Sequence, residues 1–217
     1  MQKQMFSVTN RQKDLLSLIY QYIKTAGYPP TFEEMRDGLG VKSNQSIIDL
    51  LEKLTSARYL KRNEGARSLT ILPLGYEILG EPALVPFLGA TSAGMPIEAI
   101  SITGQWHPCS VHDDRIERLQ EEMFMLRVYG DSMINAGIDD GDAVLVQTKK
   151  EFVSGEVVLA QIGDSVTIKR FISQDKPPYV YLKPENPSYS NILIRDNVEL
   201  KGKVISVLKS GYWKSIT

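Results

Sequence analysis

Cysteine is almost absent from this chain of 217 residues, which holds only Cys109. A single thiol excludes an internal disulfide framework and is typical of proteins in a reducing cytoplasm. No apolar run approaches the roughly 18 residues that a membrane-spanning helix needs. The opening residues, MQKQMFSVTN, also lack the apolar core of a secretory signal. The sequence therefore predicts a globular protein of the cytoplasm.

Histidine is scarce as well, since the chain holds only His107 and His112, both close to Cys109. No Ser–His–Asp spacing stands out, and a thiol protease built on Cys109 is less favoured still. The stretch offers too few ligands for a metal, so a surface loop is the preferred interpretation. Residues 139–142 (DDGD) lack the spacing of a calcium loop and read as a tight turn. We expect neither a metal nor a cofactor.

Charge is unevenly distributed along the chain, although the net charge is only −1. Residues 1–72 hold 11 Lys and Arg against 7 Asp and Glu, whereas residues 73–217 hold 14 against 19. A basic front end on an acidic body indicates that only the front end meets a polyanion.

Three helices are predicted in the basic front end. Thr9 or Asn10 can cap the first, which the segment 27–30 (GYPP) ends because proline cannot continue the hydrogen-bond ladder. The segment 31–34 (TFEE) has the form of a capping box for a second helix, which stops near residues 38–40 (GLG). Ser43 or Asn44 can cap the third.

A hairpin follows, because two short strand-like runs flank residues 63–67 (NEGAR), which contain a glycine. Three helices and a basic hairpin predict a winged helix-turn-helix domain over residues 1–72. The alternative is a small helical domain with no role in DNA binding. Residues 73–85, with two prolines and two glycines, read as a linker or an irregular lead-in.

Residues 86–217 read as a mainly-β domain, because short runs rich in Val, Ile, Leu and Tyr alternate with turn signals. The fold class is therefore α+β, a winged helix followed by a mainly-β domain. The predicted strands are 123–128, 143–147, 156–162, 165–171, 179–182 and 202–208.

Two side chains in the β domain are candidates for nucleophilic chemistry. Ser132 lies in the segment 129–133 (YGDSM), just after a predicted strand, where a serine can be presented at a sheet edge. Lys169 shares one face of another predicted strand with Thr167 and Phe171. A buried lysine can act as the base for a serine, because burial favours the neutral amine. Taken alone, however, Ser132 reads as a turn residue and Lys169 as a solvated lysine with its stem packed on a sheet.

Together these motifs resemble the LexA family of self-cleaving repressors. The residues that carry the resemblance are 130–133 (GDSM), 137–142 (GIDDGD), 166–170 (VTIKR) and, upstream, 88–96 (LGATSAGMP). In the front end, Arg11-Gln12 and the segments 27–31 and 38–40 match separately, so the likeness covers nearly the whole chain.

The resemblance implies a serine–lysine peptidase that cuts its own chain between Ala93 and Gly94. Ser132 would be the nucleophile and Lys169 the base, and backbone N–H groups of Asp131 and Ser132 would be candidates for holding the oxyanion. It also implies a homodimer on operator DNA. Cleavage would be stimulated by RecA recombinase on single-stranded DNA and would release DNA-damage (SOS) genes.

The start of the third helix departs from the pattern of the best-known member, so the operator sequence cannot be transferred. By residue chemistry we expect bases to be read there and phosphates to be contacted by flanking and hairpin cations. The expected DNA-contacting residues are Lys42, Ser43, Asn44, Gln45, Ser46, Arg62 and Arg67. It is open whether Ile48 faces a groove or the core.

Three alternatives remain at this point. The protein is a related dimeric repressor with a different regulon, or its protease-like domain is inert and serves only dimerisation. The third is a general peptidase of the signal-peptidase type. The attached winged helix and the lack of an apolar span weigh against the third.

Overall fold

The computed structural model describes residues 8–62, 68–90, 106–109, 123–210 and 212–216. The Ala93–Gly94 bond, Arg67 and His112 lie outside the described residues. The chain forms two compact units. The N-terminal unit comprises Met1–Val85 with Thr103–Glu121, and the C-terminal unit comprises Pro86–Ile102 with Glu122–Thr217.

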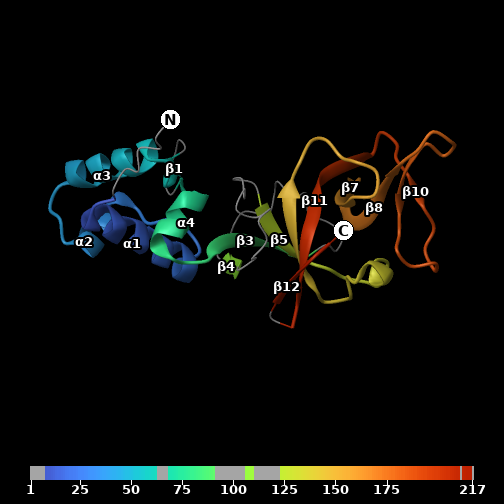
Figure 1. Ribbon diagram of the computed structural model, residues 1–217, viewed down its shortest axis with the longest axis horizontal. Coiled ribbons are helices and arrows are strands. Elements are labelled where there is room, and N and C mark those ends of the chain that lie inside the picture. Colours follow the sequence, from blue (N-terminus) through green and yellow to red (C-terminus); the bar gives the residue numbers. More distant parts are fainter. Residues whose placement is uncertain (1–7, 63–67, 91–105, 110–122, 211, 217) are drawn as a thin grey trace, which may run out of the picture. The chain divides into compact units, whose positions relative to one another are not determined.

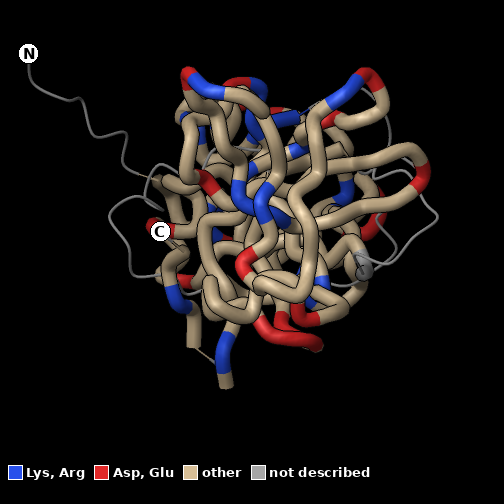
Figure 2. The backbone as a smooth tube through the Cα atoms, turned by 90° about the vertical axis from the view of Figure 1, so that its right-hand side faces the viewer, with Lys and Arg blue, Asp and Glu red and all other residues tan. Residues whose placement is uncertain are grey.

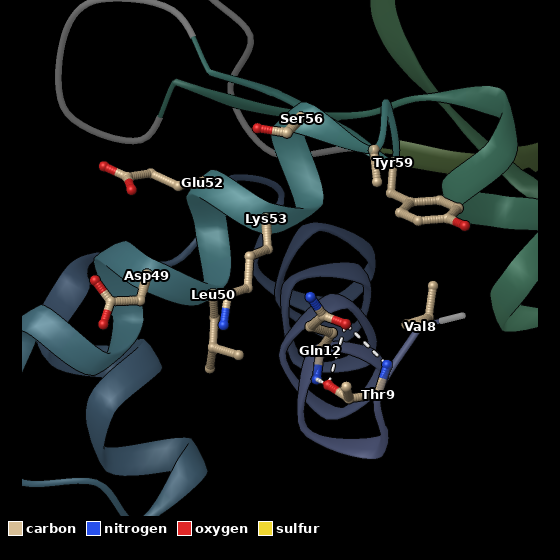
Figure 3. A pocket seen from close by; sticks show the side chains of 10 residues that line it. Val8, Thr9, Gln12, Asp49, Leu50, Glu52, Lys53, Ser56 and Tyr59 are labelled. Carbon is tan, nitrogen blue, oxygen red and sulfur yellow. Dashed lines mark hydrogen bonds between the residues drawn. The ribbon is translucent and has the colours of Figure 1, made fainter. Parts of the chain in front are cut away.

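The N-terminal unit starts with three helices, which Figure 1 draws in blue to cyan: α1 (Asn10–Ala26), α2 (Phe32–Leu39) and α3 (Asn44–Ser56). Each begins where the sequence predicts a cap. The Thr9 hydroxyl accepts from the Gln12 N–H while the Gln12 side chain accepts from the Thr9 N–H, a reciprocal pair drawn in Figure 3. Thr31 and Glu34 form the same box on α2, and Ser43 caps α3. The first two helices end at Gly27 and Gly40, both with positive φ.

A small hairpin completes the winged-helix outline. Strand β1 (Leu60–Arg62) pairs antiparallel with β2 (Leu69–Ile71), and Leu60 lies opposite Ile71. Both residues are buried with the inner faces of the three helices in one core. The tip between the strands lies outside the described residues. The predicted three helices and hairpin are therefore all present.

The segment 73–85 differs from the expectation of an irregular lead-in. It contains helix α4 (Pro73–Leu79) and the start of strand β3 (Ala83–Ala90). Pro73 occupies the first turn of α4, where no backbone N–H is needed, and Gly80 closes it with positive φ. Strand β4 (Trp106–Cys109) also belongs to this unit, and the Trp106 indole donates to the Gly27 carbonyl at 2.8 Å.

The C-terminal unit is built on one large, mostly antiparallel sheet. Within this unit, the strand order is β10-β9-β8-β7-β11-β6-β5-β3, with β12 paired to β11. Strands β3 and β5 are paired in parallel. The strands after β3 are β5 (Met123–Arg127), β6 (Ala143–Thr148), β7 (Val157–Ile162), β8 (Ser165–Ser173), β9 (Val180–Lys183), β10 (Ile192–Leu193), β11 (Val198–Lys209) and β12 (Tyr212–Ser215).

All six predicted strands of this domain are present, with ends shifted by up to four residues. Short strands with weak patterns, β10 and β12, were not predicted. Alternate residues of β7 and β8 feed two separate apolar clusters, which shows that this part of the sheet is buried on both faces.

No helix within the described residues is long and apolar enough to cross a membrane. Figure 2 shows Lys and Arg interspersed with Asp and Glu along the chain that faces the viewer. Paired charges account for part of this mixing, as where Glu156 accepts from both Lys149 and Lys203 at 2.9 Å.

Candidate active site and DNA-reading surface

Ser132 lies in the loop between β5 and a short 3-10 turn, η2 (Ile134–Ala136). Gly130 enters this loop with φ +90, a conformation that favours glycine, and its N–H donates to the Asp140 carboxylate at 2.7 Å. The turn that contains Asp140 is thereby hydrogen-bonded to the start of the loop that carries Ser132. Ser132 itself is half-buried.

Lys169 projects from β8, next to the apolar cluster shared with β7 and β9. Val158 lies opposite it on β7, and Phe171 follows on the same face. The lysine is only 6% exposed, so the alternative of a solvated lysine is wrong. Its Nζ lies 2.7 Å from Ser132 Oγ, although 37 residues separate the two in sequence. The sequence singled out both residues, and the fold brings them into hydrogen-bond contact.

Three oxygen atoms surround the Lys169 amine. Besides Ser132 Oγ they are Thr167 Oγ1 at 2.8 Å and the Ile168 carbonyl at 2.9 Å. A neutral amine has two N–H donors and one lone pair. If it donates to Thr167 and Ile168, the lone pair is left to accept the Ser132 hydroxyl proton. An ammonium would donate to all three oxygens instead, so the protonation state decides what the site can do.

Burial settles the direction of that equilibrium. Removal of the ammonium from water lowers the pKa of Lys169 from 10.5 to about 8. No carboxylate contacts its Nζ among the described residues to oppose this effect. The arrangement can therefore supply a neutral base at mildly alkaline pH, in hydrogen-bond contact with a partly accessible hydroxyl.

Several contacts of this site were missed at the sequence level. Thr167 was recognised as sharing a face with Lys169 but not as its partner. Asp131, next to Ser132, is bonded by Asn186 and Tyr189 from the loop after β9. No prediction was made for residues 184–189 (PENPSY), whose two prolines and high polarity are the signal that could have drawn attention to this segment.

The acidic segment 139–142 is a tight turn, as predicted. The Asp139 N–H donates to the Asp142 carboxylate at 2.7 Å, and the Asp142 N–H donates to the Asp139 carbonyl. Burial acts to lower the pKa of Lys209, but its ion pairs with both carboxylates together outweigh this effect and raise the pKa. No cluster of metal-ligating side chains occurs within the described ranges.

His107 and Cys109 lie on strand β4 rather than in a surface loop, so that part of the expectation is wrong. Cys109 is buried, whereas His107, two residues earlier on the same strand, is exposed. Neither residue lies in the unit that holds Ser132.

The predicted base-reading residues and the flanking Lys42 gather at the exposed start of α3. Lys42, Ser43, Asn44, Gln45 and Ser46 are all exposed, whereas Ile47 is fully buried. The Ser43 hydroxyl caps the helix, and the Gln45 amide donates to Asp49 at 2.8 Å. Ile48 is half-buried and lies outside the core cluster, which favours the groove side for it.

The hairpin contributes Arg62, which is exposed at the end of β1 with its guanidinium 5.2 Å from the centre of the Phe32 ring. This stacking leaves the fork of the guanidinium available at its edge. Arg67 was predicted to act with it but lies outside the described residues.

A hollow of about 630 Å³ lies elsewhere in the N-terminal unit, between the first turn of α1 and the last turns of α3 (Figure 3). Its lining includes Thr9, Gln12, Asp49 and Lys53. It is therefore distinct from the Ser132 site and borders α3 largely beyond its base-reading start.

Comparison with known proteins identifies both units. A family model described as LexA DNA binding domain matches residues 5–68, and one described as Peptidase S24-like matches residues 86–205. The LexA repressor of Bacillus velezensis is 34% identical over 216 residues, covering 95% of this chain and 99% of that protein. That of Bacillus subtilis is 34% identical over 209 residues, with the same coverage. That of Geobacillus kaustophilus is 35% identical over 210 residues, covering 94% and 99%. This chain therefore belongs to the LexA repressor family, as a DNA-binding transcriptional repressor with a self-cleaving serine peptidase domain.

Proposed function

We propose that this protein represses DNA-damage (SOS) genes and is inactivated when Ser132 and Lys169 cut its own chain between Ala93 and Gly94. The observation that carries the proposal is the 2.7 Å contact between Ser132 Oγ and the amine of a buried lysine. In an inert dimerisation domain, burial of a lysine beside a serine would cost folding free energy without serving a reaction, because burial of an ammonium is costly.

The reaction begins with proton transfer from Ser132 Oγ to the neutral Lys169 amine. The oxygen attacks the Ala93 carbonyl carbon, and the backbone N–H groups of Asp131 and Ser132 are the candidates for holding the oxyanion. Lys169 returns the proton to the departing Gly94 amine, which leaves an ester between Ala93 and Ser132. Water, deprotonated by the same lysine, hydrolyses this ester and restores the serine.

The tethered substrate explains why no deep peptide pocket is needed. A segment of the same chain is presented at high effective concentration. The small residues Ala93 and Gly94 allow the backbone to bend closely into a confined site. Self-cleavage is then limited by the position of the cleavage segment and by the protonation of Lys169. Because burial lowers the pKa of Lys169 only to about 8, the ammonium remains its main form at pH 7.

Cleavage after residue 93 would separate the DNA reader, in fragment 1–93, from most of the dimerising domain, in fragment 94–217. A homodimer reads two half-sites at once, whereas a released reader binds each half-site separately and weakly. RecA on single-stranded DNA is proposed as the partner that favours docking of the cleavage segment. A repressor with these partners works in the cytoplasm.

The cleavage site is tested with purified full-length chain at about pH 9–10 without any other protein, conditions that neutralise Lys169. We expect two fragments, 1–93 and 94–217, the second with Gly94 at its N-terminus. Gly94→Asp should remain folded and uncut, because a carboxylate would have to enter the confined site unpaired. Terminal sequencing and gels measure both outcomes. A Gly94→Asp chain that is cut at the wild-type rate would place the scissile bond elsewhere.

DNA reading is tested with Gln45→Ala and Arg62→Ala on operator and random duplexes at several salt concentrations. The Gln45 amide can exchange its Asp49 bond for an adenine edge, so its loss should cost about 1–3 kcal/mol on the operator and little on random DNA. Arg62→Ala should weaken both duplexes alike and reduce the salt slope by about one. Arg67→Ala is expected to behave like Arg62→Ala. Equal loss on both duplexes for Gln45→Ala would show that α3 is not the reader.

A further inference from the structure

The loop that carries Ser132 is held by a second loop, residues 185–189, which follows β9. We call this second loop the brace. The backbone carbonyl of Glu185 in the brace accepts from the N–H of Asn135, three residues after Ser132, at 2.9 Å. The side chains of Asn186 and Tyr189 donate to Asp131, the residue before Ser132. The brace therefore contacts the serine loop on both sides of the nucleophile.

Asn186 makes the contact that bears most directly on Ser132. Its amide nitrogen donates to the Asp131 carbonyl at 3.1 Å and to the Asp131 carboxylate at 3.2 Å. Its amide oxygen accepts from the Ser188 N–H at 3.0 Å, which fixes the amide so that the nitrogen faces Asp131. The side chain is thus fully oriented by its own loop.

The Asp131 carbonyl belongs to the same rigid peptide group as the Ser132 N–H. A trans peptide is planar, and its C=O and N–H point in opposite directions. The Ile134 N–H also donates to this carbonyl, at 3.2 Å, so two donors hold it. Fixing the Asp131 carbonyl therefore fixes the direction of the Ser132 N–H, an oxyanion candidate, and the start of the Ser132 residue.

The brace is also anchored to the strand that carries Lys169. The Arg170 guanidinium donates to the Glu185 carboxylate at 2.6 Å, and both side chains are mostly buried. Arg170 follows Lys169, and Glu185 precedes Asn186. A short chain of hydrogen bonds therefore connects Arg170, which follows Lys169, to Asp131, which precedes Ser132.

We propose that Asn186 is a positioning residue for self-cleavage, which orients the Asp131–Ser132 peptide through its bond to the Asp131 carbonyl. The inference rests on the proposed function, since it assigns a role in the same reaction. Asn186 contacts neither the lysine amine nor the serine hydroxyl, so it acts on the geometry of the site and not on its proton equilibrium.

The test compares self-cleavage rates of the full-length chain and its variants from pH 6 to 10. Asn186→Ala should be slower by about 10- to 100-fold at every pH, because small misplacements of a nucleophile cost rate steeply. The midpoint of its pH profile should stay at the wild-type value. Tyr189→Phe is the matched control, since it removes only a bond to the exposed carboxylate of Asp131, and should lose less than about fivefold.

Asn186→Asp separates positioning from a merely structural role. Aspartate can still accept from the Ser188 N–H and keep the turn, but it cannot donate to the Asp131 carbonyl. We expect it to be at least as slow as Asn186→Ala, with thermal unfolding close to wild type. Wild-type cutting by Asn186→Asp, or a shifted pH midpoint in Asn186→Ala, would overturn the inference. Cutting by Ser132→Ala in parallel would instead overturn the proposed function.

Discussion

Ser132→Ala is expected to leave the chain intact under conditions in which the wild type is fully cut. The hydroxyl is the only atom removed, and it is the group that would form the ester with Ala93. Loss of a nucleophilic serine in other peptidases costs about 10⁶-fold in rate, which is complete loss on the scale of a gel. The measurement is fragment formation with time, at pH 9–10 and separately with RecA on single-stranded DNA.

DNA binding and folding are the controls for this variant. Ser132 lies in the C-terminal unit, whereas the reader is formed by α3 and the hairpin of the N-terminal unit. Lys169 keeps Thr167 and Ile168 as partners when the serine hydroxyl is gone. Operator affinity and the unfolding midpoint should therefore match the wild type. Fragments 1–93 and 94–217 from Ser132→Ala would sink the assignment of the nucleophile.

Lys169→Met is expected to block cutting as completely as the serine variant. Methionine retains most of the buried stem but has no amine, so the fold keeps its packing and loses its base. Lys169→Arg is the matched variant that keeps a charge and hydrogen-bond donors. Arginine cannot be deprotonated in proteins, so it too should be uncut. Robust cutting by Lys169→Arg would mean that the lysine only holds Ser132 in place.

The wild-type rate should follow the neutral fraction of Lys169. Because burial lowers the pKa of this amine to about 8, the ammonium dominates below that pH and the free amine above it. The rate should rise about tenfold per pH unit below about pH 7.5 and level off above about pH 9. Docking of the cleavage segment excludes more water, which would move the midpoint lower still. A flat profile between pH 6 and 10 would argue against a lysine base.

Local sequence determined the parts of the fold whose signals are complete within a few residues. The side chains of Thr31 and Glu34 each accept a hydrogen bond from the other residue's backbone N–H, so the sequence of this capping box sets where the helix starts. The alternating residues 165–171 make a strand because side chains of a strand alternate between faces. Helix α4 also had such signals, Pro73 at its start and Gly80 at its end, and could have been predicted from them.

The candidate site was only partly within reach of the sequence. The sequence identified Ser132 after one predicted strand and Lys169 on another as candidates, and the family resemblance made them a nucleophile and its base. Their contact and the burial of the lysine depend on β7, β9 and the serine loop closing around one side chain. Alternation says which face a lysine takes but not what covers that face.

Tertiary structure alone decided the contacts that orient the site. Asn186 sits 55 residues from Asp131 in sequence, in a segment for which no prediction was made. Its role depends on the distance between the Asn186 side chain and the Asp131 carbonyl, which no local sequence pattern encodes. The sequence by itself thus determined the helices, the main strands and the chemistry at hand, because these depend on near neighbours. Which groups meet, which are desolvated and which are held in line was decided by packing, because burial and hydrogen bonding between distant segments exist only once the sheet has formed.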